Sequence, residues 1–217
     1  MQFADRIDAG RQLAKRLEQY RLCNPIVLAL PRGGVVVGYE IARALDAPLD
    51  VIVARKLGSP RNPEFGFGAI GPGGERVLDR GSVRMLGLTE ADIDRIAEQE
   101  LCELGRRLRS YRGDLPLPDL RGRTAIVVDD GLATGVTARA ALRAVRGMEP
   151  ARLVLAVPVS PPDTAETIRA EVDELVCLDT PAGFMAVGQF YRVFDQTPDE
   201  EVMRLLELSR KAQQERK

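Results

Sequence analysis

The stretch IVVDDGLATGVTARAAL, residues 126–142, joins an apolar run to two adjacent acids and then to a segment of small and hydroxyl residues. A continuous apolar run is typical of a strand that is buried on both faces of a parallel sheet. The residues after the threonines predict a helix. Asp129 and Asp130 are therefore expected at the carboxyl end of a buried strand, where open α/β sheets bind their ligands.

The rest of the chain alternates in the same way between short apolar runs and helical patterns. This alternation predicts an α/β fold, with a doubly wound parallel sheet and a small C-terminal hood subdomain. We expect strands at 25–31, 49–56, 123–130, 151–160 and 173–179, and helices at 4–20, 35–46, 89–109, 135–148, 161–171 and 198–215. Thr89 followed by Asp92 is close to a capping box at the start of the longest helix.

One domain is expected over residues 1–217, with its core at about 22–179. Residues 57–64 hold two prolines and a glycine and indicate an exposed, mobile loop, part of a flexible segment at about 57–75 that also includes a glycine-rich strand and turn. The aromatic segment at about 180–197 is expected to form the hood, with a possible contribution from the N-terminus.

Composition excludes several classes of function. The chain contains no histidine, which excludes histidine-dependent triads and imidazole metal sites. A net charge of −1 gives no electrostatic case for a nucleic-acid partner. The three cysteines are far apart and lack zinc spacing, and no apolar stretch approaches the ~18 residues of a membrane helix. We therefore expect a cytoplasmic protein that binds neither nucleic acid nor membrane.

The residues after the acid pair are suited to a phosphate. Gly135 permits close backbone approach, and the amides of Thr134, Gly135, Val136 and Thr137 would be unpaired donors at the start of a helix. The threonine hydroxyls add neutral donors. The adjacent carboxylates suit a sugar diol, or a metal held through water. The stretch therefore predicts a site for a phosphorylated sugar.

Other interpretations of the same stretch remain open. It could be an ordinary strand-to-helix turn with solvated acids and a threonine cap, or a phosphorylatable acid pocket as in receiver domains, which would not need the TGVT segment. A simple phosphoryl-transfer enzyme is disfavoured because the chain has no GxxxxGK[ST] loop.

Residues 127–137, VVDDGLATGVT, closely resemble the phosphoribosyl pyrophosphate (PRPP) motif of type I phosphoribosyltransferases. That motif consists of two acids, a few small or apolar residues, then TG and a threonine. The resemblance implies that Asp129 and Asp130 are the catalytic residues and contact the ribose hydroxyls. It also implies that Ala133 through Thr137 bind the 5′-phosphate.

The same resemblance points to a pyrophosphate site in two other segments. The loop after the first strand offers Arg32, Gly33 and Gly34, whose amides and guanidinium suit a diphosphate. Arg55 and Lys56 end the second expected strand and resemble basic residues that reach the pyrophosphate in relatives. Each feature also has a plain structural interpretation, as a direction-changing turn or as solvated strand ends.

The flexible loop with Arg61 resembles the loop that closes over bound PRPP, which would exclude water from a reactive sugar cation. Which of Arg61 and Lys56 closes over the pyrophosphate is left open. The hood resembles the variable segment that stacks on the acceptor base. Its candidate stacking residues are Phe184, Tyr191 and Phe194, although core packing explains such aromatics equally well.

Together these features imply Mg²⁺-dependent transfer of phosphoribosyl from PRPP to a nitrogenous base, with release of pyrophosphate. No direct metal ligand is expected, because Mg²⁺ would be held through PRPP and water near the acid pair. Ala133 stands where enzymes for hypoxanthine and guanine carry an acid, which disfavours a 6-oxopurine acceptor. The alternative is a non-catalytic PRPP-binding regulator of the same fold. Relatives are often homodimers, and the acceptor base cannot be read from the sequence.

Overall fold

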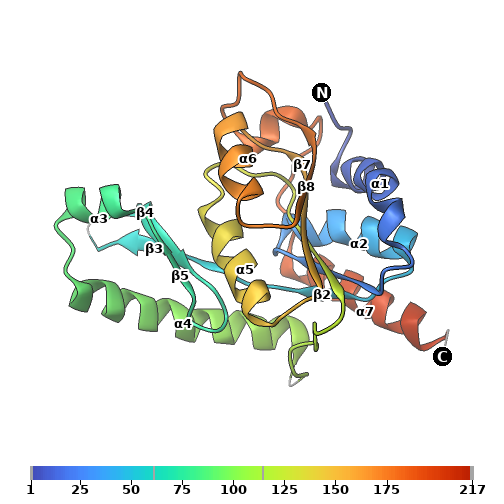
Figure 1. Ribbon diagram of the computed structural model, residues 1–217, viewed down its shortest axis with the longest axis horizontal. Coiled ribbons are helices and arrows are strands. Elements are labelled where there is room, and N and C mark those ends of the chain that lie inside the picture. Colours follow the sequence, from blue (N-terminus) through green and yellow to red (C-terminus); the bar gives the residue numbers. More distant parts are fainter. Residues whose placement is uncertain (1, 61, 114, 216–217) are drawn as a thin grey trace.

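The computed structural model describes residues 2–60, 62–113 and 115–215. Its central sheet has five parallel strands in the order β2-β1-β6-β7-β8 (Figure 1). The strands are β1 Pro25–Ala29, β2 Leu49–Val51, β6 Thr124–Val128, β7 Arg152–Val159 and β8 Glu174–Asp179. The predicted doubly wound parallel sheet is therefore confirmed.

Helices cover both faces of this sheet, which explains why its strands are continuous apolar runs. On one face lie α1 Arg6–Leu17, α2 Gly33–Leu45 and α7 Asp199–Gln214, and on the other α5 Val136–Gly147 and α6 Pro162–Arg169 (Figure 1). Successive side chains of each strand point to opposite faces of the sheet. Val27 of β1 packs toward α1 and α2, and Leu28 packs toward α5. Across the described ranges, no helix combines the length and the apolarity needed to span a bilayer.

A second, smaller sheet projects from one side of the core (Figure 1). Its antiparallel strands are β3 Arg55–Ser59, β4 Asn62–Ile70 and β5 Arg76–Leu78, followed by α3 Arg80–Leu86 and α4 Glu90–Arg112. Thr89 and Asp92 form the anticipated capping box at the start of α4. The separate helix α3 was not predicted from the sequence.

The structure corrects two predictions in this region. Arg55 and Lys56 do not end a core strand, because β2 ends at Val51 and these residues begin β3 of the small sheet. The apolar run 49–54 stays largely buried while it crosses between the sheets, so its composition gave no sign of the change. Residues 57–64, expected as a loop, belong largely to the β3–β4 hairpin. Arg61 lies outside the described residues, and movement of this hairpin on ligand binding stays a prediction.

A buried ion pair fixes the end of α4 against the core. Arg112 Nη2 lies 2.9 Å from Asp50 Oδ2 in β2, and the two side chains are 5% and 17% exposed. Burial raises the pKa of Asp50, and the charge of Arg112 opposes that rise. Such a pair adds little net stability, but removing one partner leaves a buried charge, which ties the helix to this position.

The aromatic segment at 180–197 contains the short 3₁₀ helix η2 Val187–Phe190 and packs against the N-terminus. A second short 3₁₀ helix, η1 Glu18–Tyr20, follows α1. The Phe3 amide donates to the Phe190 carbonyl at 2.7 Å, and the Phe3 carbonyl accepts from the Arg192 amide at 2.9 Å. The N-terminal residue Phe3 therefore pairs with the aromatic segment at 180–197, for which we keep the name hood.

Candidate functional site

The candidate site lies where the strand order reverses. The chain runs from β1 outward to β2 and later returns to place β6 on the opposite side of β1. Ala29 at the end of β1 is in register with Val128 at the end of β6, and the Leu30 amide donates to the Val128 carbonyl at 2.8 Å. The loop after β1 and the acids after β6 therefore meet in one crevice, as is typical of doubly wound sheets.

Asp129 and Asp130 follow β6 directly, as predicted, and both side chains are half-buried. Asp129 Oδ1 accepts a hydrogen bond of 2.8 Å from the amide of Asp130. Desolvation raises the pKa of Asp129 well above its ordinary value, and the neighbouring Asp130 carboxylate adds to the rise. Two adjacent carboxylates in this setting can accept hydrogen bonds from hydroxyl groups or bind a hydrated cation.

Arg6, the first residue of α1, is a site residue that the sequence did not reveal. Its Nε donates to Asp130 Oδ2 at 2.7 Å, and its Nη1 donates to the carbonyl of Asp195 at 2.8 Å. Its guanidinium also lies 3.9 Å from the ring centroid of Phe194. Arg6 and Asp130 are 124 residues apart in sequence, so no local pattern could have paired them.

The segment after the acids forms the expected strand-to-helix loop. Gly135 is the N-cap of α5 with φ of 69°, and a Cβ there would lie 2.8 Å from Thr164 Cγ2. Ala133 and Thr134 are exposed, while Val136 and Thr137 in the first turn of α5 are half-buried. The first amides of a helix have no intrahelical acceptor and lie at the positive end of its dipole, so they suit an anion.

The loop at 31–34 packs directly against the acid pair. A Cβ on Gly33 would lie 1.9 Å from Asp130 Oδ2 and 2.6 Å from Arg6 Nε, and one on Gly34 would lie 2.8 Å from the Val128 carbonyl oxygen. Arg32 is half-buried, and the peptide bond between Pro31 and Arg32 is cis. Glycine is needed at 34 because the backbone of Val128 and Asp129 lies too close for a side chain, and at 33 because the side chains of Asp130 and Arg6 already fill that space.

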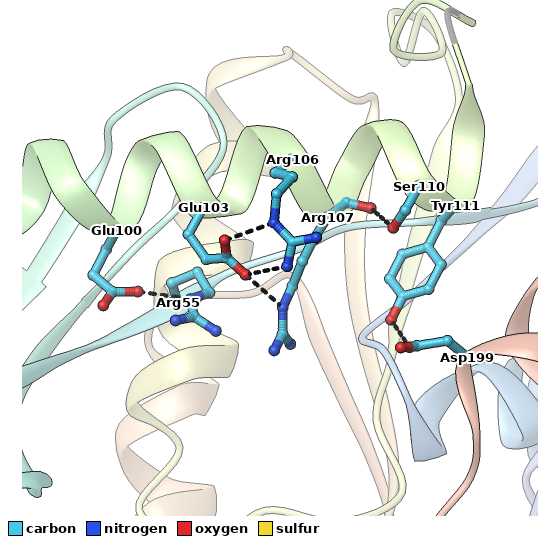
Figure 2. Close-up of polar contacts among 8 residues, drawn as sticks. All are labelled: Arg55, Glu100, Glu103, Arg106, Arg107, Ser110, Tyr111 and Asp199. Atoms are coloured by element: carbon cyan, nitrogen blue, oxygen red, sulfur yellow. Dashed lines mark hydrogen bonds and ion pairs between the residues drawn. The ribbon is translucent and has the colours of Figure 1, made fainter.

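Arg55 and Lys56 lie farther along, at the start of the small sheet. Arg55 Nε donates to Glu100 of α4 at 2.7 Å, as Figure 2 shows. On the same side of α4, Glu103 binds Arg106 and Arg107 (Figure 2).

Lys56 lines a cleft of about 780 Å³ between the small sheet and the start of α5. Thr134 and Thr137 lie on the other wall of this cleft. Lys56 therefore shares a cleft with the loop that begins α5, and Arg55 binds a carboxylate of α4.

The hood aromatics pack against one another more than they face an open space. Tyr191 is 5% exposed, its ring centroid lies 5.4 Å from that of Phe3 and 4.8 Å from that of Phe194, and its hydroxyl donates to the Asp130 carbonyl at 2.5 Å. Phe184 and Phe194 are half-buried. Tyr191 offers no open face for a base in this arrangement, which leaves Phe184 and Phe194 as candidates.

The donor set of the site fits a hydrated divalent cation. Carboxylate oxygens are ligands that Mg²⁺ accepts, usually with water and substrate phosphates completing its shell. Among the residues that the structure describes, no group of three or more acids, cysteines or histidines could hold a metal ion. A cation in the crevice would be held through water by Asp129 and Asp130, the carboxylates that follow β6.

Comparisons with known proteins agree with this geometry. The family model of the phosphoribosyl transferase domain matches residues 3–191. The Mycobacterium tuberculosis proteins MT0597 (strain CDC 1551) and Rv0571c (strain H37Rv), whose names assign them provisionally to the phosphoribosyl transferases, are each 50% identical over 205 residues. That match covers 94% of this chain and 46% of each relative. The chain thus spans about half the length of these relatives.

A solved structure has the same fold as this chain. The protein TT1426 from Thermus thermophilus is 43% identical and superposes with a TM-score of 0.80 over 95% of this chain and 98% of its own. The crevice, the acids after β6 and the loop that begins α5 all lie within the matched range. The chain therefore belongs to the phosphoribosyl transferase domain family.

Proposed function

We propose that the protein transfers the 5-phosphoribosyl group of PRPP to the nitrogen of a heterocyclic base and releases pyrophosphate. The observation that carries this proposal is the meeting of three features at one crevice. These are the acid pair after β6, the helix start at Val136 and the glycine loop at 31–34. A PRPP molecule whose ribose lies at the acid pair would have its 5′-phosphate at the helix start and its pyrophosphate at the glycine loop.

Each part of the ligand then has a protein group of matching chemistry. The unpaired amides of Val136 and Thr137 receive the 5′-phosphate, and the hydroxyls of Thr134 and Thr137 add neutral donors. Asp129 and Asp130 accept hydrogen bonds from the ribose hydroxyls.

The amides of the 31–34 loop and the Arg32 guanidinium receive the pyrophosphate. Lys56 lines the neighbouring cleft and completes this basic side. Mg²⁺, held through water by the acid pair and through the diphosphate, would neutralise charge on the leaving group.

In the reaction the bond between ribose C1 and the pyrophosphate oxygen breaks, and the electron pair leaves with the pyrophosphate. The acceptor nitrogen uses its lone pair to bond to C1, and its proton passes to the released pyrophosphate. Positive charge that develops on the ribose lies beside two carboxylates, and negative charge on the leaving group lies beside amides and a guanidinium. Catalysis of this kind requires no covalent nucleophile, in agreement with a chain that lacks histidine.

The test combines binding with turnover. Calorimetric titration with PRPP, with and without Mg²⁺, should show saturable binding that is lost in the Asp129→Asn, Asp130→Asn double variant. Asp119→Asn is the matched control, because this exposed acid pairs only with Arg121 among the contacts described for it. Wild-type affinity in the double variant would remove the acid pair from the site.

A screen of nucleobases for pyrophosphate release then identifies the acceptor. Replacing Asp130 alone with Asn should lower the rate by roughly 10²–10³-fold, the usual cost of losing one preorganised electrostatic group. Tight PRPP binding without pyrophosphate release from any base would instead support a PRPP-binding regulator.

A further inference from the structure

Arg6 contacts three segments that would surround PRPP: the acid pair, the hood and the glycine loop. It starts on α1, binds the Asp130 carboxylate at 2.7 Å, binds the hood at the Asp195 carbonyl at 2.8 Å and stacks on the Phe194 ring. Its Nε also lies 2.6 Å from where a Gly33 Cβ would be. One side chain therefore touches the acid pair, the hood and the glycine loop.

A second arginine on the same helix shows what an ordinary structural ion pair looks like here. Arg11 Nε lies 3.1 Å from Glu40 of α2, but the Arg11 side chain is 62% exposed. The Arg6 side chain is only 12% exposed and Asp130 is 17% exposed. Burying an arginine to this extent is tolerated when its guanidinium N–H groups donate to well-placed acceptors. Arg6 meets this condition because its Nε and Nη1 donate to two different acceptors.

Asp130 is held both at its side chain and at its backbone, by Arg6 of α1 and by Tyr191 of the hood. The Tyr191 hydroxyl donates to its backbone carbonyl, and Arg6 donates to its carboxylate. Arg6 is itself fixed by the Phe194 ring beneath it and the Asp195 carbonyl beside it. The carboxylate orientation is thus set before any ligand arrives, which spares the entropy of ordering it during binding.

We propose that Arg6 is a positioning residue that aims the Asp130 carboxylate at the ribose hydroxyls of PRPP. This inference rests on the proposed function, because it assigns Arg6 a role at that same site. It also gives the hood a second role, in which Phe194 supports the arginine that orients the acid. Arg6 acts through Asp130, so its effect should require that carboxylate and should concern the sugar more than the diphosphate.

The test uses Arg6→Lys, which keeps the positive charge but loses the planar fork. Affinities for Mg²⁺-PRPP and for Mg²⁺-pyrophosphate are measured by calorimetry on the full chain. Arg6→Lys should weaken PRPP binding on the order of 10-fold, comparable to the loss of one charge-assisted hydrogen bond. The affinity for Mg²⁺-pyrophosphate, which has no ribose, should fall by less than about twofold, because the positive charge is conserved. Arg11→Lys is the matched control and should leave both affinities unchanged.

A double-mutant cycle separates positioning from general structural support. In the Asp130→Asn background, Arg6→Lys should add less than about twofold to the loss of PRPP affinity, because the two residues act as one unit. Phe194→Leu is a second variant that removes the ring beneath the guanidinium and keeps Arg6. It should weaken PRPP binding in the wild-type background only, which keeps the idea testable if Arg6→Lys does not fold.

Failure of the inference and failure of the proposed function give different results. If the wild-type protein does not bind Mg²⁺-PRPP, the proposed function is wrong. If the wild-type protein binds it and both variants bind within twofold of it, only the role of Arg6 is overturned. A loss that is equally large in the Asp130→Asn background, or equally large for pyrophosphate, would also overturn that role.

Discussion

Replacing Gly33 with alanine tests how closely the glycine loop and the acid pair are packed. The new Cβ would lie 1.9 Å from Asp130 Oδ2, 2.7 Å from Asp130 Cγ and 2.6 Å from Arg6 Nε. Real Cβ atoms essentially never approach another atom within 3.0 Å, so the carboxylate must move by about 1.1 Å. Gly33 begins α2 without a left-handed φ, so alanine is acceptable to the backbone and the collision is the main effect.

The expected magnitude follows from what the collision breaks. Moving the carboxylate disrupts the 2.7 Å bond from Arg6, and charge-assisted bonds contribute about 1.5–3 kcal/mol. Overpacking adds about 1–3 kcal/mol, part of which the same movement relieves. We therefore expect Gly33→Ala to lower the free energy of unfolding by about 2–4 kcal/mol. Affinity for Mg²⁺-PRPP should fall on the order of 10-fold, the usual cost of losing one charge-assisted hydrogen bond.

Urea unfolding and calorimetric titration measure the two effects. Gly105→Ala in α4 is the matched control, because a Cβ there meets nothing within 4 Å. In a helix interior this change should raise stability by about 0.5–1 kcal/mol and leave PRPP binding unaltered. If Gly33→Ala kept wild-type stability and bound PRPP within twofold of wild type, the packing of loop against acid would be refuted.

Three further predictions concern groups away from the crevice. Burial raises the pKa of Cys177 to about 11, so at pH 8 iodoacetamide should label the exposed Cys23 and Cys102 within minutes and Cys177 far more slowly, as peptide mass spectrometry would show. Burial, followed by the hydrogen bond to a carboxylate, raises the pKa of Tyr111 from 10.0 to about 12. The stability that this shift contributes is intact below pH 10 and is lost as the pH approaches 12. The urea midpoint of Tyr111→Phe should therefore fall less over that range than the wild-type midpoint, and an equal fall would contradict the assignment. Arg121→Ala breaks an ion pair whose side chains are 72% and 65% exposed, and should change the unfolding free energy by less than about 0.5 kcal/mol in the same assay.

The core of the site could be predicted because its parts are adjacent in sequence. The acids and the helix start lie within residues 127–137, so strand periodicity, glycine placement and threonine donors act together in one short segment. The loop at 31–34 could be assigned to the same crevice because carboxyl ends of parallel strands share one edge. Local rules were therefore sufficient for these parts.

Features set by distant contacts could not be predicted. The run 49–54 is mostly apolar both where it pairs with β1 and where it crosses to the small sheet. The end of β2 at Val51 could therefore not be predicted from the local sequence. Arg6 belongs to a helix whose charge pattern is that of any amphipathic surface helix, and only the fold brings it to Asp130. The residue type shows which interactions a side chain can make, but the fold determines which distant residue becomes its partner.

The hood shows how an expectation drawn from composition can give an incomplete account of a segment. Its aromatic residues suggested a surface for stacking a base, yet Tyr191 is buried and places its hydroxyl on the Asp130 carbonyl, while Phe194 lies beneath Arg6. Tyr191 therefore contacts Asp130 directly and Phe194 contacts its partner Arg6, so under the proposed function changing either for acceptor specificity would disturb the ribose site as well. Phe184, which packs on Phe190 beside the 90% exposed Met185, has no contact of this kind among those described. Differences in acceptor preference between relatives should accordingly be carried by the Phe184 end of the hood, where side chains can vary without moving Asp130.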